Sequence, residues 1–180
     1  MLRFFILFIV ILVTLFTAEL TLLVQNAVVL PWTEALVRIS SGLITVFDSH
    51  VVASGKVLRS TANGFAISVE VGCNGVEAAI VLIAAMLAFP APWKSRAIGM
   101  LVGLTAVQVL NIVRVISLFY LGQWNRQAFD WAHLYLWQTL ITLDVLIVWL
   151  VWIRMLPKSP PAVPAPQPPE KSGSQHVIAP

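Results

Sequence analysis

The stretch AIGMLVGLTAVQVLNIVRVISLFYL, residues 97–121, decides the class of fold, because it is apolar over an unusual length. As a helix rising 1.5 Å per residue, it is long enough to cross the roughly 30 Å hydrocarbon core of a bilayer. Three further runs of similar character lie at Phe4–Val24, Val71–Ala91 and Ala132–Leu156. The sequence therefore predicts an all-α integral membrane protein with about four transmembrane helices.

The composition of the whole chain agrees with this class. Of 180 residues, 59% are hydrophobic and 11% are charged, which is far from the averages of soluble domains. The net charge of +3 lies mostly in short loops and tails, and no basic stripe indicates a nucleic-acid partner. The only cysteine is Cys73, which excludes an intramolecular disulfide, a CxxC redox pair and a thiolate metal cluster. We expect no cofactor and no metal.

The segment between the first two apolar runs, residues 25–72, is predicted to be extracytoplasmic. Its first part, PWTEALVRISSGLITVF at residues 31–47, carries apolar side chains at helical spacing. These side chains are Leu36, Ile39, Leu43 and Phe47. The pattern predicts a small amphipathic helix that lies on the membrane surface.

The second part of this segment predicts a β-hairpin that leads directly into the second apolar run. VVASGKVLRS and FAISVEV, residues 51–60 and 65–71, are joined through TANG. Asn63-Gly64 favours a tight turn with positive φ angles. In the second strand, Phe65, Ile67, Val69 and Val71 alternate with polar residues, so we expect them to share one side.

The basic residues predict that both chain termini face the cytoplasm. The short turn PAPWKSR, residues 90–96, is the type of basic loop that stays inside. The first run is longer than the apolar core of a signal peptide and is predicted to be retained as an anchor. The predicted organisation is transmembrane helix 1 (1–24), the extracytoplasmic segment (25–72), a three-helix core (73–156), whose candidate catalytic residues are described below, and a disordered, proline-rich cytoplasmic tail (157–180).

Ionisable side chains inside hydrocarbon are unfavourable by a few kcal/mol and require a partner or a function. Arg114 follows Gln108 and Asn111 at steps of three on one helix face. It either snorkels to the outer boundary as an anchor or faces inward toward a partner, and the polar stripe favours the second interpretation. The other ionisable residues of this kind are Glu19, Glu77 and Asp144. Asp144 is too far along its helix to orient His133, and we expect it to pair with another buried polar group.

The segment CNGVE, residues 73–77, predicts the start of the second helix. Asn74 and Glu77 have the spacing of a reciprocal cap, so we expect the helix to begin at Asn74. Cys73 would then precede the first turn, where backbone N–H groups and the helix dipole favour the thiolate. For Glu77, capping is the simpler interpretation and a direct catalytic part is the alternative.

The predicted topology puts three chemically complementary residues at one depth. Cys73 lies at the outer start of the second helix, Arg114 near the outer end of the third and His133 on the first turn of the fourth. Taken alone, His133 fits an aromatic belt. A nucleophile, a cation and a titratable base at one boundary indicate acyl transfer, with the arginine stabilising the thiolate or the oxyanion. Asn74, Glu77 and Asn111 are the expected supporting residues.

At these residues the sequence resembles the exosortase/archaeosortase family of membrane-embedded cysteine transpeptidases, in particular the exosortase H type. The resemblance covers residues 51–156 and is carried by CNG at 73–75, NIVR at 111–114 and HLYLW at 133–137. It implies that Cys73, Arg114 and His133 are the catalytic residues.

The resemblance also implies a multi-pass enzyme of the bacterial inner membrane with an extracytoplasmic active site. Its substrates would be secreted proteins that end in a short motif resembling Ile-Pro-Thr-Leu, a spanning helix and a basic end. The enzyme would cleave at the motif, hold the substrate as a thioester and transfer it to an acceptor in the cell envelope. The alternative is a non-catalytic membrane subunit or scaffold, in which Arg114 pairs with Glu77 and Cys73 only packs.

Overall fold

The structure, a computed structural model, describes residues 2–156. The tail predicted to be disordered, 157–180, lies outside the described residues. Four helices are long and apolar enough to cross a membrane, namely Leu2–Glu19, Leu22–Ile44, Trp93–Trp124 and Arg126–Met155. A small sheet follows the second of them. The predicted class, an all-α membrane protein with about four transmembrane helices, is confirmed. The set of four differs from the predicted one: residues 25–44 were predicted to be extracytoplasmic, and the run predicted at Val71–Ala91 contains only a shorter apolar helix, Val76–Ala88.

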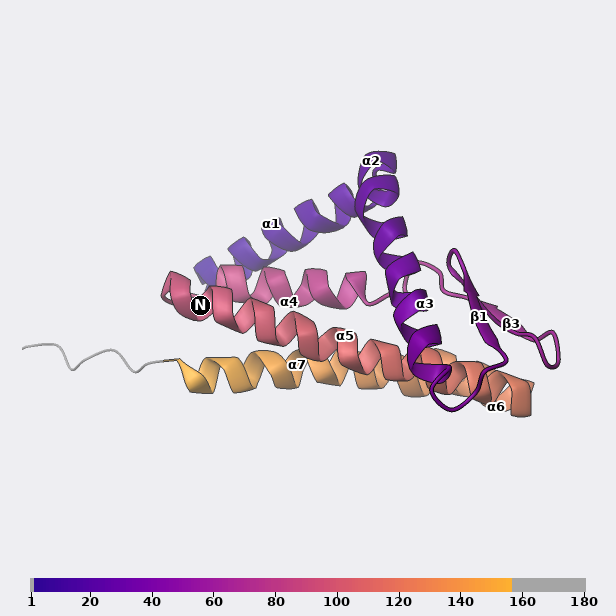
Figure 1. The fold of residues 1–180 in the computed structure, drawn as a ribbon. Coiled ribbons are helices and arrows are strands. Elements are labelled where there is room, and N and C mark those ends of the chain that lie inside the picture. Colours follow the sequence, from indigo (N-terminus) through magenta and orange to yellow (C-terminus); the bar gives the residue numbers. More distant parts are fainter. Residues whose placement is uncertain (1, 157–180) are drawn as a thin grey trace, which may run out of the picture.

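A bundle of helices forms the body of the molecule (Figure 1). Helix α4 (Val76–Ala88) contacts α1 (Leu2–Glu19), α5 (Trp93–Trp124) and α7 (Trp137–Met155). It is shorter than the predicted run Val71–Ala91, because a left-handed glycine precedes it and the extended residue Phe89 stands before a proline. Its central position explains why its apolar residues are buried on several sides.

The second apolar helix differs in direction from the bundle. It consists of α2 (Leu22–Val24), a π-helical turn η1 (Gln25–Val29) and α3 (Leu30–Ile44), and in Figure 1 α3 runs across the other helices. It begins nine residues before the predicted surface helix at 31–47. Leu36 is fully buried, whereas Ile39 and Leu43 are about half exposed, so only part of the predicted apolar stripe packs against protein.

The extracytoplasmic hairpin of the prediction contains a third strand. Strands β1 (Val51–Ser54), β2 (Val57–Ser60) and β3 (Ala66–Ser68) form an antiparallel sheet in the order β1-β2-β3. The predicted first strand folds back on itself at Gly55, which has a φ of +55°. Residues 51–60 therefore form a hairpin of their own.

The turn at TANG is wider than predicted. Ser60 and Phe65 are hydrogen-bonded across a four-residue loop, in which Gly64 has a positive φ and Asn63 does not. Four-residue loops of this kind are built around ordinary turns rather than the mirror-image turns of two-residue hairpins. Val69 is buried but Val71 is 54% exposed, so these two residues do not share one environment, because the strand ends at Ser68.

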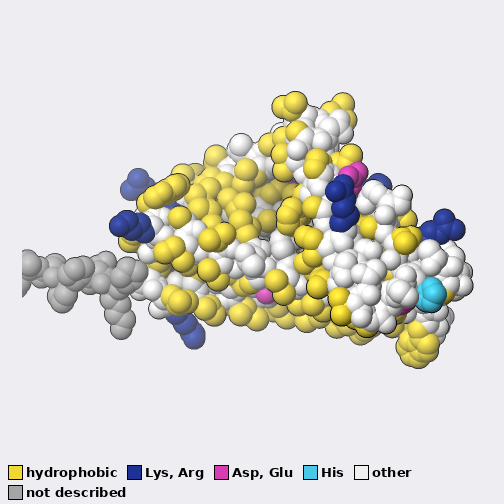
Figure 2. All heavy atoms as spheres, in the orientation of Figure 1, with side chains coloured by type: hydrophobic (Ala, Val, Ile, Leu, Met, Phe, Trp, Pro, Cys, Tyr) yellow, Lys and Arg dark blue, Asp and Glu magenta, His cyan; other side chains and the backbone are white. Residues whose placement is uncertain are grey.

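The sheet, α3 and the end of α5 enclose a hydrophobic core next to the Cys73 loop. This core contains Leu36, Val37, Ile44, Val51, Leu58, Val69, Val115 and Phe119, and Cys73 packs against it. Figure 2 shows that hydrophobic side chains cover much of the bundle on this face, while Lys and Arg gather toward its ends. This distribution suits a bundle whose middle faces lipid.

Candidate active site

Cys73 lies in a short loop between β3 and α4, and glycines shape this loop on both sides. Gly72 and Gly75 have φ angles of +88° and +75°, which favour glycine. Because Gly75 is left-handed, α4 begins at Val76 rather than at Asn74. The prediction that Cys73 immediately precedes the first helical turn is therefore wrong.

The predicted reciprocal cap is also wrong in its register. The Asn74 side-chain oxygen accepts a hydrogen bond from the backbone N–H of Val76 at 3.1 Å. The Glu77 carboxylate accepts from the N–H of Gly72, not from that of Asn74. Asn74 thus holds the first residue of α4 but is not its N-cap, which is Gly75. Glu77 holds Gly72, the residue that precedes Cys73.

Helix α3 fixes the loop from the outside through two residues that the sequence did not single out. Asn74 is fully buried, and its side-chain amide donates to the Thr33 hydroxyl at 3.0 Å. The Trp32 indole N–H donates to the Asn74 carbonyl at 3.2 Å. Both partners lie about forty positions away in the chain, so no local pattern connects them to the Cys73 loop.

Arg114 faces the interior and contacts the Cys73 loop. Its side chain is buried, with 3% of the residue exposed. Nη2 donates to Cys73 Sγ at 3.5 Å, and Nη1 donates to the Gly72 carbonyl at 3.4 Å. Of the two interpretations left open by the sequence, the structure therefore supports the inward-facing arginine rather than the snorkelling anchor.

The arginine–glutamate pair of the scaffold alternative is not formed. Among residues 2–156, the ion pairs join Arg38 to Glu34, Lys56 to Glu70 and Arg126 to Asp130, all at the surface. None of these involves Arg114 or Glu77. The guanidinium is instead directed at a sulfur atom and a backbone carbonyl.

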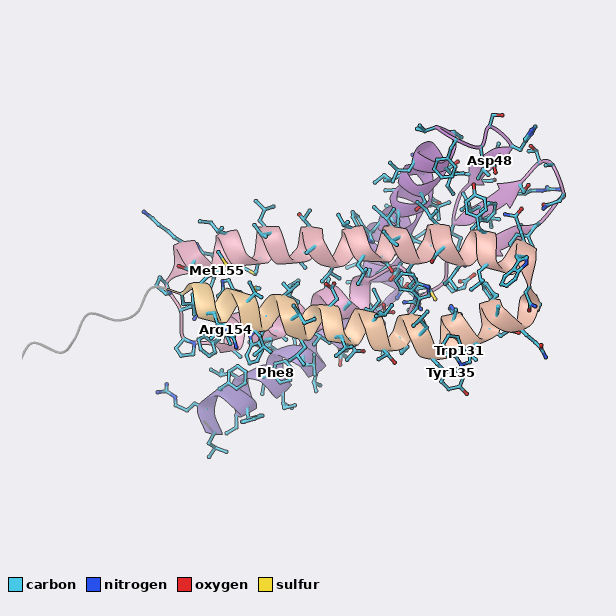
Figure 3. All side chains as sticks on the ribbon, turned by 90° about the horizontal axis from the view of Figure 1, so that it is seen from below. Phe8, Asp48, Trp131, Tyr135, Arg154 and Met155 are labelled. Atoms are coloured by element: carbon cyan, nitrogen blue, oxygen red, sulfur yellow. The ribbon has the colours of Figure 1, made fainter. Side chains whose placement is uncertain are left out.

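His133 approaches Cys73 from the last helix, which continues from α6 (Arg126–Trp131) through a π-helical turn η2 (Ala132–Leu136) into α7. Its Nε2 lies 3.8 Å from Cys73 Sγ, and its ring stacks on Phe129 with the centroids 5.7 Å apart. Trp131 and Tyr135 point away from the bundle (Figure 3) and are more than half exposed. The aromatic belt and the inward histidine thus occupy different faces of one helix.

The polar stripe of α5 supports the loop from below. Gln108 Nε2 donates to the Gly75 carbonyl at 3.2 Å, and Asn111 is fully buried. A Cβ atom added at Gly75 would lie 2.8 Å from Gln108 Oε1 and 3.1 Å from Asn111 Nδ2. Gly75 is therefore needed both for its φ angle and for its lack of a side chain.

The sulfur atom is held in a mostly apolar environment. Burial raises the pKa of the Cys73 thiol above its ordinary value, the Arg114 charge opposes this effect, and Glu77 and Glu70 add to it. The thiolate that a helix start at Asn74 would favour is therefore not favoured, because α4 begins at Val76, two residues later. The arrangement instead places a protonated thiol beside an imidazole that can accept its proton.

Two of the ionisable residues in the predicted membrane spans, Glu19 and Asp144, have side chains that form no hydrogen bond with the candidate site. Glu19 is 4% exposed and its Oε1 has no hydrogen-bond partner. Asp144 Oδ2 is also buried without a partner, so the expected pairing of Asp144 is not found among the described residues. The same part of the chain holds no group of three or more His, Cys, Asp or Glu side chains that could bind a metal ion.

A pocket of about 270 Å³ opens beside the loop. The end of the pocket at the loop is lined by Gly72, Gly75 and Arg114, and the rest is lined by residues of α1, α4 and α7. Two of these, Gln138 and Thr142, were not singled out by the sequence analysis. Their spacing of four in an otherwise apolar run was the signal available.

One of the comparisons with known proteins found a match. Residues 1–150 match a family model described as transmembrane exosortase. Searches of curated proteins and of solved structures found no match.

Proposed function

The chain belongs to the transmembrane exosortase family, and on this premise we propose that it is a cysteine transpeptidase with Cys73, Arg114 and His133 as its catalytic residues. The observation that carries the proposal is the meeting of these three side chains. They come from three separate elements, and the guanidinium and the imidazole lie 3.5 and 3.8 Å from one sulfur atom. A packing cysteine does not require either neighbour.

In the proposed reaction, Cys73 Sγ attacks the carbonyl carbon of the scissile peptide bond while its proton passes to His133 Nε2. Arg114 Nη2 stabilises the negative charge that develops on sulfur and on the carbonyl oxygen. As the tetrahedral intermediate collapses, the C–N bond breaks and His133 returns the proton to the leaving amine. The substrate remains as a thioester on Cys73.

The second half of the reaction repeats these roles. An acceptor nucleophile of the cell envelope attacks the thioester carbonyl and gives its proton to His133. The carbon–sulfur bond then breaks, and the thiolate recovers the proton from the imidazolium.

The proposed substrates are secreted proteins with a C-terminal sorting tail that consists of a short motif of the Ile-Pro-Thr-Leu type, a spanning helix and a basic end. The proposed location is the bacterial inner membrane, with Cys73 on the extracytoplasmic side. The positive-inside pattern of the loops supports this orientation. The family membership supports the class of substrate.

The test is co-expression of the protein with a tailed substrate, followed by detection of the processed form and of a covalent adduct. We expect Cys73→Ala to abolish both while the membrane level of the protein is unchanged. Cys73→Ser should be almost inactive, because an alcohol near pH 7 is a much weaker nucleophile than a thiol that a base deprotonates. The adduct should be released by hydroxylamine, as a thioester is. Normal processing by Cys73→Ala would refute the proposal.

A further inference from the structure

The pocket beside the Cys73 loop is lined by Arg114, but not by Cys73 or His133, and it continues along α7. It starts beneath Gly72 and Gly75, and its lining on α7 extends to Val145. Helix α4 closes one side with Ala78 and Val81, and Phe16 of α1 contributes a further wall. The pocket is therefore a groove between α4 and α7 that begins at the proposed site.

The α7 wall of this groove carries two polar residues, Gln138 and Thr142, beside Ile141 and Val145, whereas the α4 wall below Glu77 is apolar. Gln138 and Thr142 line the groove and are exposed in the structure. Residues four apart lie on one face of an α-helix. The side-chain amide of Gln138 is unfavourable against lipid tails, and its position in the groove allows it to bind a polar occupant instead.

The π-helical turn brings these two residues into line with His133. The N–H of Trp137 bonds to the carbonyl of Ala132, five residues earlier. In such a turn residue i+5 takes the place above residue i that i+4 takes in an α-helix. Gln138 follows His133 by five residues and Thr142 follows Gln138 by four. All three therefore follow one another along a single face.

A substrate that enters this site from the membrane must present an extended backbone. The scissile carbonyl has to leave a helix to reach Cys73 Sγ, and the neighbouring N–H and C=O groups lose their helical partners. In a water-poor environment such unpaired groups are strongly unfavourable. The enzyme must therefore supply hydrogen-bonding groups along the path of the unwound segment.

On the basis of the proposed function, we propose that Gln138 and Thr142 bind the backbone of the extended substrate segment between the scissile bond and the substrate's spanning helix. Gln138 offers an amide donor and a carbonyl acceptor. The Thr142 hydroxyl donates to the Gln138 carbonyl at 2.8 Å, so its oxygen remains free to accept a substrate N–H. Both are positioning residues, and recognition of backbone leaves the side-chain sequence of this segment unspecified.

The groove also sets the length of the unwound segment. Thr142 follows His133 by nine residues, which is about 13 Å along a helix. An extended chain covers about 3.3 Å per residue. The segment that lies unwound against α7 is therefore about four residues long.

Cysteine cross-linking tests this placement without catalysis. Cys73→Ala removes the only thiol of the chain, and Thr142→Cys is then added. Thr139→Cys is the matched control, because Thr139 is also exposed and its hydroxyl also donates to the carbonyl four residues earlier, yet it lies outside the groove lining. The substrate carries one cysteine, moved residue by residue after the motif. We expect disulfide formation with Thr142→Cys to peak about four residues past the scissile bond and to exceed that with Thr139→Cys.

The kinetic test uses Thr142→Val, which keeps the shape of the side chain, and Thr139→Val as control. Loss of a hydrogen bond should lower the processing rate about threefold to tenfold, mainly through KM, while alkylation of Cys73 by a small thiol reagent stays unchanged. Equal effects of the two valine variants, or equal cross-linking at 139 and 142, would overturn the inference. Either result leaves the proposed function intact if Cys73→Ala still abolishes processing. Cross-linking at 142 without processing by the unmodified chain would instead refute the proposed function alone.

Discussion

Gly75→Ala is expected to damage the site through one specific contact. The left-handed φ of +75° is unfavourable for alanine by about 1–2 kcal/mol. The new Cβ would also lie 2.8 Å from Gln108 Oε1 and 2.9 Å from Gln108 Nε2. Loss of the hydrogen bond from Gln108 to the Gly75 carbonyl adds about 1 kcal/mol. The free energy of unfolding should therefore fall by roughly 2–3 kcal/mol.

The effect on activity should be larger than the effect on stability suggests. The new methyl group would crowd the side chains of Gln108 and of the fully buried Asn111, and we expect the loop that carries Cys73 to shift in response. A displacement of about 1 Å can reduce a reaction rate about a hundredfold, and a shift of a few tenths of an ångström should reduce it about tenfold.

Gly64→Ala is the matched control. Gly64 also has a φ of +75°, but a Cβ there would meet nothing within 4 Å. Gly64→Ala should therefore lower the free energy of unfolding only by the cost of placing alanine in the left-handed conformation, and its activity should be unchanged. The assays are thermal unfolding in detergent and substrate processing in membranes. If Gly75→Ala and Gly64→Ala behave alike in both assays, or if Gly75→Ala/Gln108→Ala recovers no processing, the close contact beneath the loop does not position Cys73.

Three further outcomes are expected. Arg114→Lys keeps a charge but loses the planar donors, so substrate processing should fall about 100- to 1,000-fold while the protein still inserts normally. In a double-mutant cycle, Glu77→Ala should not restore the processing that Arg114→Ala abolishes. Such a rescue would show that Arg114 and Glu77 form a structural pair. Burial raises the pKa of Cys73 and the Arg114 charge lowers it. The rate of thiol alkylation without substrate should therefore keep increasing with pH beyond the range of an ordinary cysteine, and Arg114→Ala should move the midpoint of this pH dependence higher still. A midpoint below that of free cysteine would contradict this environment. In a Cys73→Ala background, Asn63→Cys should react with an impermeant thiol reagent in intact cells, whereas Ser95→Cys and a cysteine placed in the tail should not. The reverse accessibility would put the proposed site in the cytoplasm.

The sequence predicts those features of this protein that depend on local composition. Apolar runs of the right length identify the bundle helices, because hydrocarbon imposes that length. The convergence of Cys73, Arg114 and His133 follows from the order of the helices and from depth alone. Depth does not specify rotation about a helix axis. For Arg114 the polar stripe with Gln108 and Asn111 favoured the inward direction, and the structure decided between the two interpretations.

The sequence does not predict contacts that depend on distant backbone geometry. The bonds of Thr33 and Trp32 to Asn74 join segments that share no pattern. The helix start was displaced because the cap spacing at Asn74 and Glu77 competes with a left-handed Gly75, and the glycine conformation decides the boundary. The π-helical turn at His133 depends on packing around the whole helix.

This turn has a consequence for the comparison of related sequences. One residue corresponds to about 100° of rotation in an α-helix. A relative with one residue fewer between its histidine and its counterpart of Gln138 would retain a continuous α-helix, with four residues from one to the other. A relative with the same spacing but no π-helical turn would direct its histidine away from the groove. A single alignment gap in this segment therefore marks a change in backbone geometry, and the histidine and the α7 groove residues should be aligned as separate blocks.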